Sequence, residues 1–150
     1  MTRVNTIRLS VFSLGLTAAV FAGAAQAQEG GAYSAMVASH AAAHGLPPSL
    51  VHRVIMRESR YNPRAVSKGN YGMMQIRLGT ARAMGYTGSA AGLLDPNTNM
   101  TYAVKYLAGA YLVAGGNAER AARLYRSGYY YEAKRKGLLE ETGLKTKKKK

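Results

Sequence analysis

The sequence predicts a mainly α-helical protein with one folded domain. Apolar residues recur at helical spacing in several segments, whereas the alternating pattern of strands is nearly absent. Glycine, proline and asparagine residues separate these segments, and about 120 residues remain after an N-terminal leader, enough for one modest core. The 150 residues include no cysteine, which excludes disulfides and thiolate metal sites. Packing alone must therefore stabilise the domain.

Residues 1–27 have the features of a cleaved signal peptide. Two early arginines precede an uncharged, apolar run over residues 9–25. The run ends in Ala25-Gln26-Ala27, the small-x-small pattern after which a signal peptidase cuts. An uncleaved anchor is the alternative, because such a run lies at the lower limit for spanning a bilayer. We expect cleavage after Ala27, export to the periplasm and no stable membrane anchor.

The first two expected helices are separated by prolines. Residues 33–45 are rich in alanine and finish with a glycine that is well placed to end a helix. Leu46-Pro47-Pro48 interrupts the chain, and a new helix begins at about Ser49. Asn62-Pro63 ends this second helix, because proline disfavours helical backbone in the residue before it.

Four more helices are expected after a loop-like stretch over residues 70–72. The longest follows the capping residues of Asp95-Pro96-Asn97-Thr98-Asn99 and carries an apolar stripe. The four ranges are 78–85, 100–116, 117–128 and 129–137. Beyond Gly137 the chain is polar and rich in lysine, so we expect a folded domain over residues 28–137 and a basic, disordered tail over residues 138–150.

The charge balance favours a polyanionic partner. The chain has 21 lysines and arginines against 7 aspartates and glutamates. Without Arg3 and Arg8 of the leader, 19 cations and 7 acids give a net charge of +12. Export argues against nucleic acid, so cell-wall polymer with acidic peptide stems or an anionic membrane surface fits better. The alternative is that the charge serves solubility alone.

Glu58 is the single carboxylate between residues 30 and 94. It continues the i, i+3, i+4 pattern of Val51, Val54 and Ile55, which places it on an apolar helix face. The residues three and four positions away are uncharged, so a local ion pair has no partner. Desolvation there raises the pKa toward the range of a general acid, while nearby arginines lower it. A glutamate bonded to backbone amides or to a distant cation is the alternative.

Glu58 also lacks an obvious carboxylate partner. Ordinary glycosidases flank the scissile bond with two carboxylates. Most other acids of the chain suit a terminal segment, a cap or the first turn of a helix, and Glu132 is the least explained of them. His40 and His44 have a metal-binding spacing but no third ligand, so no metal site is expected. If Glu58 is catalytic, it works without a second carboxylate.

Several short blocks around this acid occur at a characteristic spacing. They are Glu58-Ser59, Tyr61-Asn62-Pro63, Ala65-Val66-Ser67, Gly72-Met73-Met74-Gln75-Ile76, Asp95-Pro96-Asn97-Thr98-Asn99 and Tyr106-Leu107. In these blocks the chain resembles the soluble lytic transglycosylase (SLT) family, whose catalytic domain is lysozyme-like. The resemblance covers roughly residues 46–128.

The resemblance implies a reaction with Glu58 as the sole acid/base. Glu58 would protonate the glycosidic oxygen of the β-1,4 bond between N-acetylmuramic acid and N-acetylglucosamine. It would then take a proton from the muramoyl 6-hydroxyl as that group attacks, which leaves a 1,6-anhydromuramoyl end. No metal or cofactor is needed. The implied partner is the peptidoglycan strand, and by analogy a cell-envelope secretion or appendage assembly.

The resemblance also implies further site residues. Gln75 matches a substrate-lining glutamine, and Ser59 and Ser67 match polar positions near the acid. Tyr125 lies where the family has a tyrosine that bonds to the catalytic carboxyl. Ser67 as a turn residue and Tyr125 as a core residue are the alternatives.

Arg77 and Arg126 depart from the family pattern. Arg77 stands where an apolar groove residue is common, and Arg126-Ser127-Gly128 replaces the usual Asn-Ala-Gly. We expect both arginines to bind acidic stem peptides. Two other readings stay open: a hydrolytic muramidase with Glu132 or a fixed water network as its base, and a peptidoglycan-binding module of the same fold that is catalytically weak.

Overall fold

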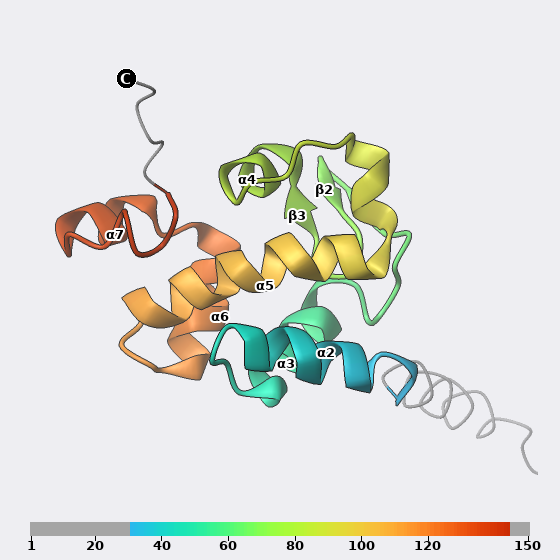
Figure 1. The fold of residues 1–150 in the computed structure, drawn as a ribbon, viewed down its shortest axis with the longest axis horizontal. Helices are drawn as coiled ribbons and strands as arrows, with labels where there is room; N and C mark the ends of the chain where they lie inside the picture. Colours follow the sequence, from blue (N-terminus) through green and yellow to red (C-terminus); the bar gives the residue numbers. More distant parts are fainter. Residues whose placement is uncertain (1–30, 145–150) are drawn as a thin grey trace, which may run out of the picture.

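The computed structural model describes residues 31–144, and its main feature is a set of short helices around one long helix (Figure 1). The predicted signal peptide and residues 145–150 lie outside the described residues. The helices are α2 (Ser34–Ala43), α3 (Pro48–Glu58), α4 (Leu78–Ala83), α5 (Pro96–Val113), α6 (Ala118–Ser127) and α7 (Tyr130–Arg135). The other elements are the strands β1 (Val66–Ser67), β2 (Asn70–Tyr71) and β3 (Ile76–Arg77) and the 3-10 helix η1 (Ala90–Leu94).

Helix α5 forms the centre of the domain. It contacts α2 and α6, and it also contacts α4 and η1, which lie with the small sheet on its other side (Figure 1). One face of α5 is buried along the length of the helix and carries these apolar side chains: Met100, Ala103, Val104, Leu107, Ala110 and Val113. The predicted fold class, mainly α and lysozyme-like with very little sheet, is therefore confirmed.

Helix α3 carries the predicted apolar stripe. Val51, Val54 and Ile55 are buried in the core, as the helical spacing predicts. The helix begins at Pro48, where the fixed φ of proline suits the first helical position. It ends at Glu58, four residues before Asn62-Pro63. The stripe thus places Glu58, the last residue of α3, on the side of the helix that faces the core.

The sheet is antiparallel, with strand order β1-β2-β3 and two residues in each strand. Val66 pairs with Tyr71, and Tyr71 pairs with Ile76. The stretch expected to be a loop over residues 70–72 thus includes the central strand. Two residues are too few to show a strand pattern, which is why the sequence did not reveal it.

The C-terminal segment differs from the prediction. Disorder was expected from residue 138, but residues 138–144 form turns against the domain, with Leu138, Leu139 and Leu144 packed on the core. Thr142 is buried, and its hydroxyl donates a hydrogen bond of 2.8 Å to the carbonyl of Leu138. The expectation of disorder is therefore wrong for residues 138–144, because leucines anchor this segment despite its polar composition. No helix within residues 31–144 is long and apolar enough to cross a membrane.

Candidate active site

Glu58 is placed by the end of α3 and by a sharp turn after it. Ser59 caps the helix, and its N–H donates to the carbonyl of Ile55 at 3.0 Å. Arg60 and Tyr61 then adopt φ of +53° and +66°, the left-handed region that non-glycine residues rarely occupy. Such strained backbone costs about 1–3 kcal/mol per residue and is concentrated at functional sites.

The Glu58 carboxyl is partly buried and unpaired. Burial raises its pKa above the ordinary 4.5, while the positive charges of Arg126 and Arg57 oppose the rise without reversing it. Within residues 31–144 the carboxyl makes no ion pair or hydrogen bond. The competition between desolvation and arginines is thus resolved in favour of desolvation. The alternative of a Glu58 bonded to amides or to a distant cation does not fit these contacts.

A buried asparagine fixes the loop that faces Glu58. The Oδ1 atom of Asn99 accepts a hydrogen bond from the backbone N–H of Met74 at 2.9 Å. Its Nδ2 atom donates to the carbonyls of Tyr71 and Leu93, both at 2.8 Å. Gly72 lies against this side chain with φ of +72°, and a Cβ there would collide with Asn99 and with the Leu93 carbonyl. The two sequence blocks that contain Gly72 and Asn99 are therefore locked together.

Ser59 and Tyr125 hold the same loop from two other helices. The Ser59 hydroxyl donates to the carbonyl of Met73 at 2.7 Å, and the Tyr125 hydroxyl donates to the carbonyl of Met74 at 2.7 Å. The bond implied between Tyr125 and Glu58 is thus replaced by one to the backbone. Burial, and next the nearby Glu58 charge, raise the pKa of Tyr125 well above its usual range. Both residues position the loop beside the acid.

Gln75 has a fixed side-chain amide. Its backbone is left-handed, with φ of +49°, and its Nε2 atom donates to the carbonyls of Ala65 and Gly72, both at 3.0 Å. These two bonds use both amide hydrogens. The Oε1 atom is consequently left to accept a hydrogen bond from a ligand in the groove.

Three adjoining hollows form one groove past Glu58. The central hollow, about 410 Å³, is lined by six of the seven predicted site residues: Glu58, Ser67, Gln75, Arg77, Tyr125 and Arg126. A hollow of about 540 Å³ extends from Glu58 past Ser59 to Arg64. A third, of about 300 Å³, continues from the central hollow in the other direction to Thr80 and Gly128. The structure thus brings all seven predicted residues together along one open groove.

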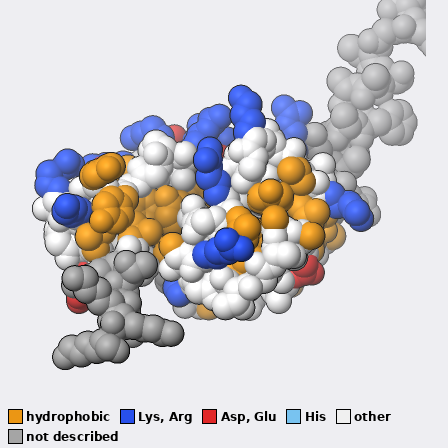
Figure 2. Space-filling model, turned by 90° about the horizontal axis from the view of Figure 1, so that it is seen from above, with side chains coloured by type: hydrophobic (Ala, Val, Ile, Leu, Met, Phe, Trp, Pro, Cys, Tyr) orange, Lys and Arg blue, Asp and Glu red, His pale blue; other side chains and the backbone are white. Residues whose placement is uncertain are grey.

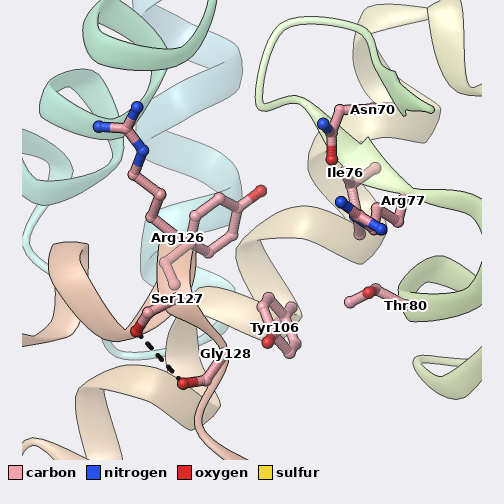
Figure 3. A pocket seen from close by; sticks show the side chains of 9 residues that line it. Asn70, Ile76, Arg77, Thr80, Tyr106, Arg126, Ser127 and Gly128 are labelled. Carbon is pink, nitrogen blue, oxygen red and sulfur yellow. Dashed lines mark hydrogen bonds between the residues drawn. The ribbon is translucent and has the colours of Figure 1, made fainter. Parts of the chain in front are cut away.

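Figure 3 shows the third hollow. Arg126, Ser127 and Gly128 lie on one side of it, and Asn70, Ile76 and Arg77 lie on the other, with the ring of Tyr106 between them. Arg77 and Arg126 also line the central hollow, so they mark the passage between the two spaces. The way from the central hollow to the third hollow therefore runs past both residues.

Sequence reasoning missed several residues that line the groove: Arg57, Lys68, Asn70, Thr80 and Tyr106. Lys68 and Gly69 form the two-residue turn between β1 and β2, with φ of +50° and +77°. Glycine at the second position suits such a turn, but lysine at the first is not the asparagine or aspartate of the strong hairpin signal, so the sequence indicates this turn only weakly. The sequence contains no comparable signal for Thr80 or Tyr106.

Glu132, the base that a hydrolytic muramidase would use, lies outside the groove. It pairs with Arg120 on α6 and with Lys136 at 3.5 Å, and it lines none of the three hollows. His40 bonds to Asn97 at 2.9 Å. Among residues 31–144, no three histidine or acidic side chains are grouped as a metal site requires.

Fold and groove together define a mainly α, lysozyme-like domain with a single acid in an open cleft. Residues 35–146 match the family described as the transglycosylase SLT domain, and the chain belongs to this family. Membership implies peptidoglycan cleavage of the lytic transglycosylase type in general. Proteins with this domain act on peptidoglycan, typically outside the cytoplasm.

Proposed function

We propose that this protein is an exported lytic transglycosylase that cuts the β-1,4 bond between N-acetylmuramic acid and N-acetylglucosamine. Glu58 is its sole general acid/base, and a 1,6-anhydromuramoyl end is its product. One observation carries the proposal: of the described residues that line the groove, Glu58 is the only carboxylate, and it is partly buried and unpaired.

The surroundings of Glu58 suit two successive proton transfers. Burial raises the pKa of Glu58 and so favours its protonated form, from which Glu58 donates the proton to the glycosidic oxygen as the bond to the muramoyl C1 breaks. The resulting carboxylate is stabilised by the charges of Arg126 and Arg57. It then takes the proton of the muramoyl 6-hydroxyl while the O6 atom bonds to C1. The carboxyl returns to its starting form, and neither water nor a second acid is consumed.

The other site residues divide by their contacts. Gln75 and Ser67 are assigned to the sugars, because the Gln75 Oε1 atom is left as an acceptor and Ser67 is exposed in the groove. Ser59 and Tyr125 are positioning residues, since their hydroxyls donate to the carbonyls of the loop.

Arg77 and Arg126 are assigned to acidic stem peptides. Replacing both with glutamine should weaken binding to peptide-bearing glycan and leave binding to naked glycan intact; equal loss on both would contradict this role.

Digestion of purified sacculi tests the proposal. Mass spectrometry of the products should show anhydromuramoyl ends with the native protein and none with Glu58→Gln. The matched control is Glu132→Gln, which removes an equally sized carboxyl outside the groove and should release the same ends as the native protein. Reducing ends would instead indicate a muramidase, and intact sacculi with protein bound would indicate a binding module.

A further inference from the structure

Ten of the fourteen lysines and arginines in residues 31–144 fall into two groups with different surroundings, and the other four lie outside both: Arg82, Lys105, Lys134 and Arg135. Four cations of the described chain are paired with acids: Arg53 and Arg123 with Glu119, and Arg120 and Lys136 with Glu132. None of the six cations that line the groove has an acid within 4.0 Å among residues 31–144: Arg57, Arg60, Arg64, Lys68, Arg77 and Arg126. The groove therefore holds six cations without an ion pair and a single acid, Glu58.

Three of these cations gather in one hollow beside the catalytic acid. Arg57, Arg60 and Arg64 all line the hollow of about 540 Å³ that extends from Glu58 away from Arg77 and Arg126. All three are exposed. Figure 2 shows one face of the molecule on which lysine and arginine side chains are numerous and acidic ones few. We call Arg57, Arg60 and Arg64 the arginine basin.

The backbone beneath the arginine basin is held in place. The N–H of Arg60 donates to the carbonyl of Ile55 at 3.1 Å, and the N–H of Arg64 donates to Oδ1 of Asn62 at 2.9 Å. Arg60 keeps this position at the cost of a left-handed φ of +53°. The side chains are thus free to reach a ligand, while the points from which they start are fixed.

The basin suits carboxylates better than a diffuse polyanion. A guanidinium group presents a planar fork of donors that binds a carboxylate through two parallel hydrogen bonds, and the basin consists of arginines alone. The proposed reaction places a muramoyl sugar at Glu58. That sugar carries the peptide stem, so the stem with its free carboxylates starts in the groove next to the basin.

We propose that the arginine basin binds the carboxylates of the peptide stem, so that the protein prefers peptide-bearing strands over strands without peptides. This inference rests on the proposed function, because it takes Glu58 as the place of the cut. It adds a second place for stem binding to the one given to Arg77 and Arg126, which line the central hollow and the third hollow but not the hollow of the basin. Cations on both sides of Glu58 suit a polymer in which every second sugar bears a stem.

The test uses the full chain with Arg60→Gln and Arg64→Gln together. Arg57 is kept, because its charge acts on Glu58. The matched control is Arg82→Gln with Arg135→Gln, which removes the same charge from exposed positions on α4 and at the end of α7 that line none of the groove hollows. Thermal unfolding is compared first, and both double variants should unfold at the same temperature as the native protein.

Cleavage and binding are then measured on three substrates: peptide-bearing strands, the same strands after an amidase has removed the peptides, and strands whose stem carboxylates are amidated. We expect the basin variant to lose about tenfold in kcat/KM and in affinity on the first substrate only, the loss of one or two charge-assisted bonds. The control should match the native protein on all three.

Several results would overturn the inference. The first is that the basin variant loses equally on all three substrates, and the second is that it loses on none. The third is that its binding to double-stranded DNA falls as much as its binding to peptide-bearing strands, which would show a general polyanion patch. If the native protein releases no anhydromuramoyl ends from any substrate, the proposed function fails, and the binding measurements still decide on the basin. If the native protein cuts all three substrates equally well, the basin inference alone fails.

Discussion

Glu58 and Glu132 are the two partly buried acids among residues 31–144, and their surroundings are opposite. Glu132 lies between Arg120 and Lys136 and has an ion pair with each. Glu58 lies in the groove with no ion pair, and burial raises its pKa. A paired acid stabilises the fold through its charge, whereas burial without an ion pair favours the protonated form of an acid. Exposure alone therefore does not distinguish these two acids, whereas their partners do.

The largest expected difference concerns activity. Glu58→Gln keeps the shape of the side chain but removes the proton donor, so the cleavage rate should fall by about 10²–10⁴-fold, the usual contribution of general acid–base catalysis. Glu132→Gln should keep the native rate to within a small factor. Release of soluble fragments from sacculi measures both, and comparable activity of the two variants would remove the distinction between the acids.

The second prediction concerns the loop beside Glu58. Gly72→Ala adds a Cβ that collides with Asn99 and with the Leu93 carbonyl, so the free energy of unfolding should fall by about 1–3 kcal/mol through overpacking, with loss of cleavage. Gly69→Ala is the control, since φ there is also positive, at +77°, and a Cβ would meet nothing within 4 Å. Urea unfolding compares the two. Equal losses of unfolding free energy in the two variants would show that the positive φ, and not the contact with Asn99, causes the destabilisation.

The third prediction concerns the stability of the paired acid. Glu132→Gln removes the negative charge that Arg120 and Lys136 share, and these cations are partly exposed. The free energy of unfolding should therefore fall by only about 1 kcal/mol at neutral pH. Glu58→Gln should not destabilise the protein there, because it removes a charge that burial disfavours. Thermal unfolding of both variants checks the contrast, and a larger loss for Glu58→Gln would contradict it.

The smallest expected effect is a shift in pH dependence. Glu58 must be protonated to act as the acid, so activity declines as the pH rises through its pKa. The charge of Arg126 lowers that pKa, and Arg126→Gln should raise it and move the alkaline limb of kcat/KM to higher pH. Strands without peptides are the right substrate, because binding of stems then plays no part. A limb that stays in place, or moves to lower pH, would show that Arg126 does not act on Glu58.

Local patterns predicted most of the helices and the position of the acid. The apolar spacing of Val51, Val54 and Ile55 placed Glu58 on the inner face of α3, because three successive turns of one helix share one environment. The caps also appeared in the sequence: the Asp95 side chain accepts the N–H of Thr98 at 2.7 Å, and the Asn117 side chain accepts the N–H of Arg120 at 2.8 Å.

Contacts between distant segments could not be predicted in this way. Asn99 bonds to Met74 across 25 positions, and Tyr125 bonds to the same residue across 51. A local pattern has no information on such pairs, so Tyr125 was expected at the carboxyl and is found at a backbone carbonyl. The order of residues 138–144 depends in the same way on packing of Leu138, Leu139 and Leu144 against the core, and the lysines of residues 145–150 made the whole tail look polar.

The central claim is that Glu58 acts alone and that the 6-hydroxyl of the substrate takes the place of water. Digestion of sacculi in water enriched in ¹⁸O, followed by mass spectrometry, tests it most directly. The muramoyl ends should be 1,6-anhydro sugars without ¹⁸O, released by the native protein and not by Glu58→Gln. New reducing muramoyl ends, more numerous than in sacculi kept in the same water without protein, would contradict the claim, because they would show that water attacks the sugar.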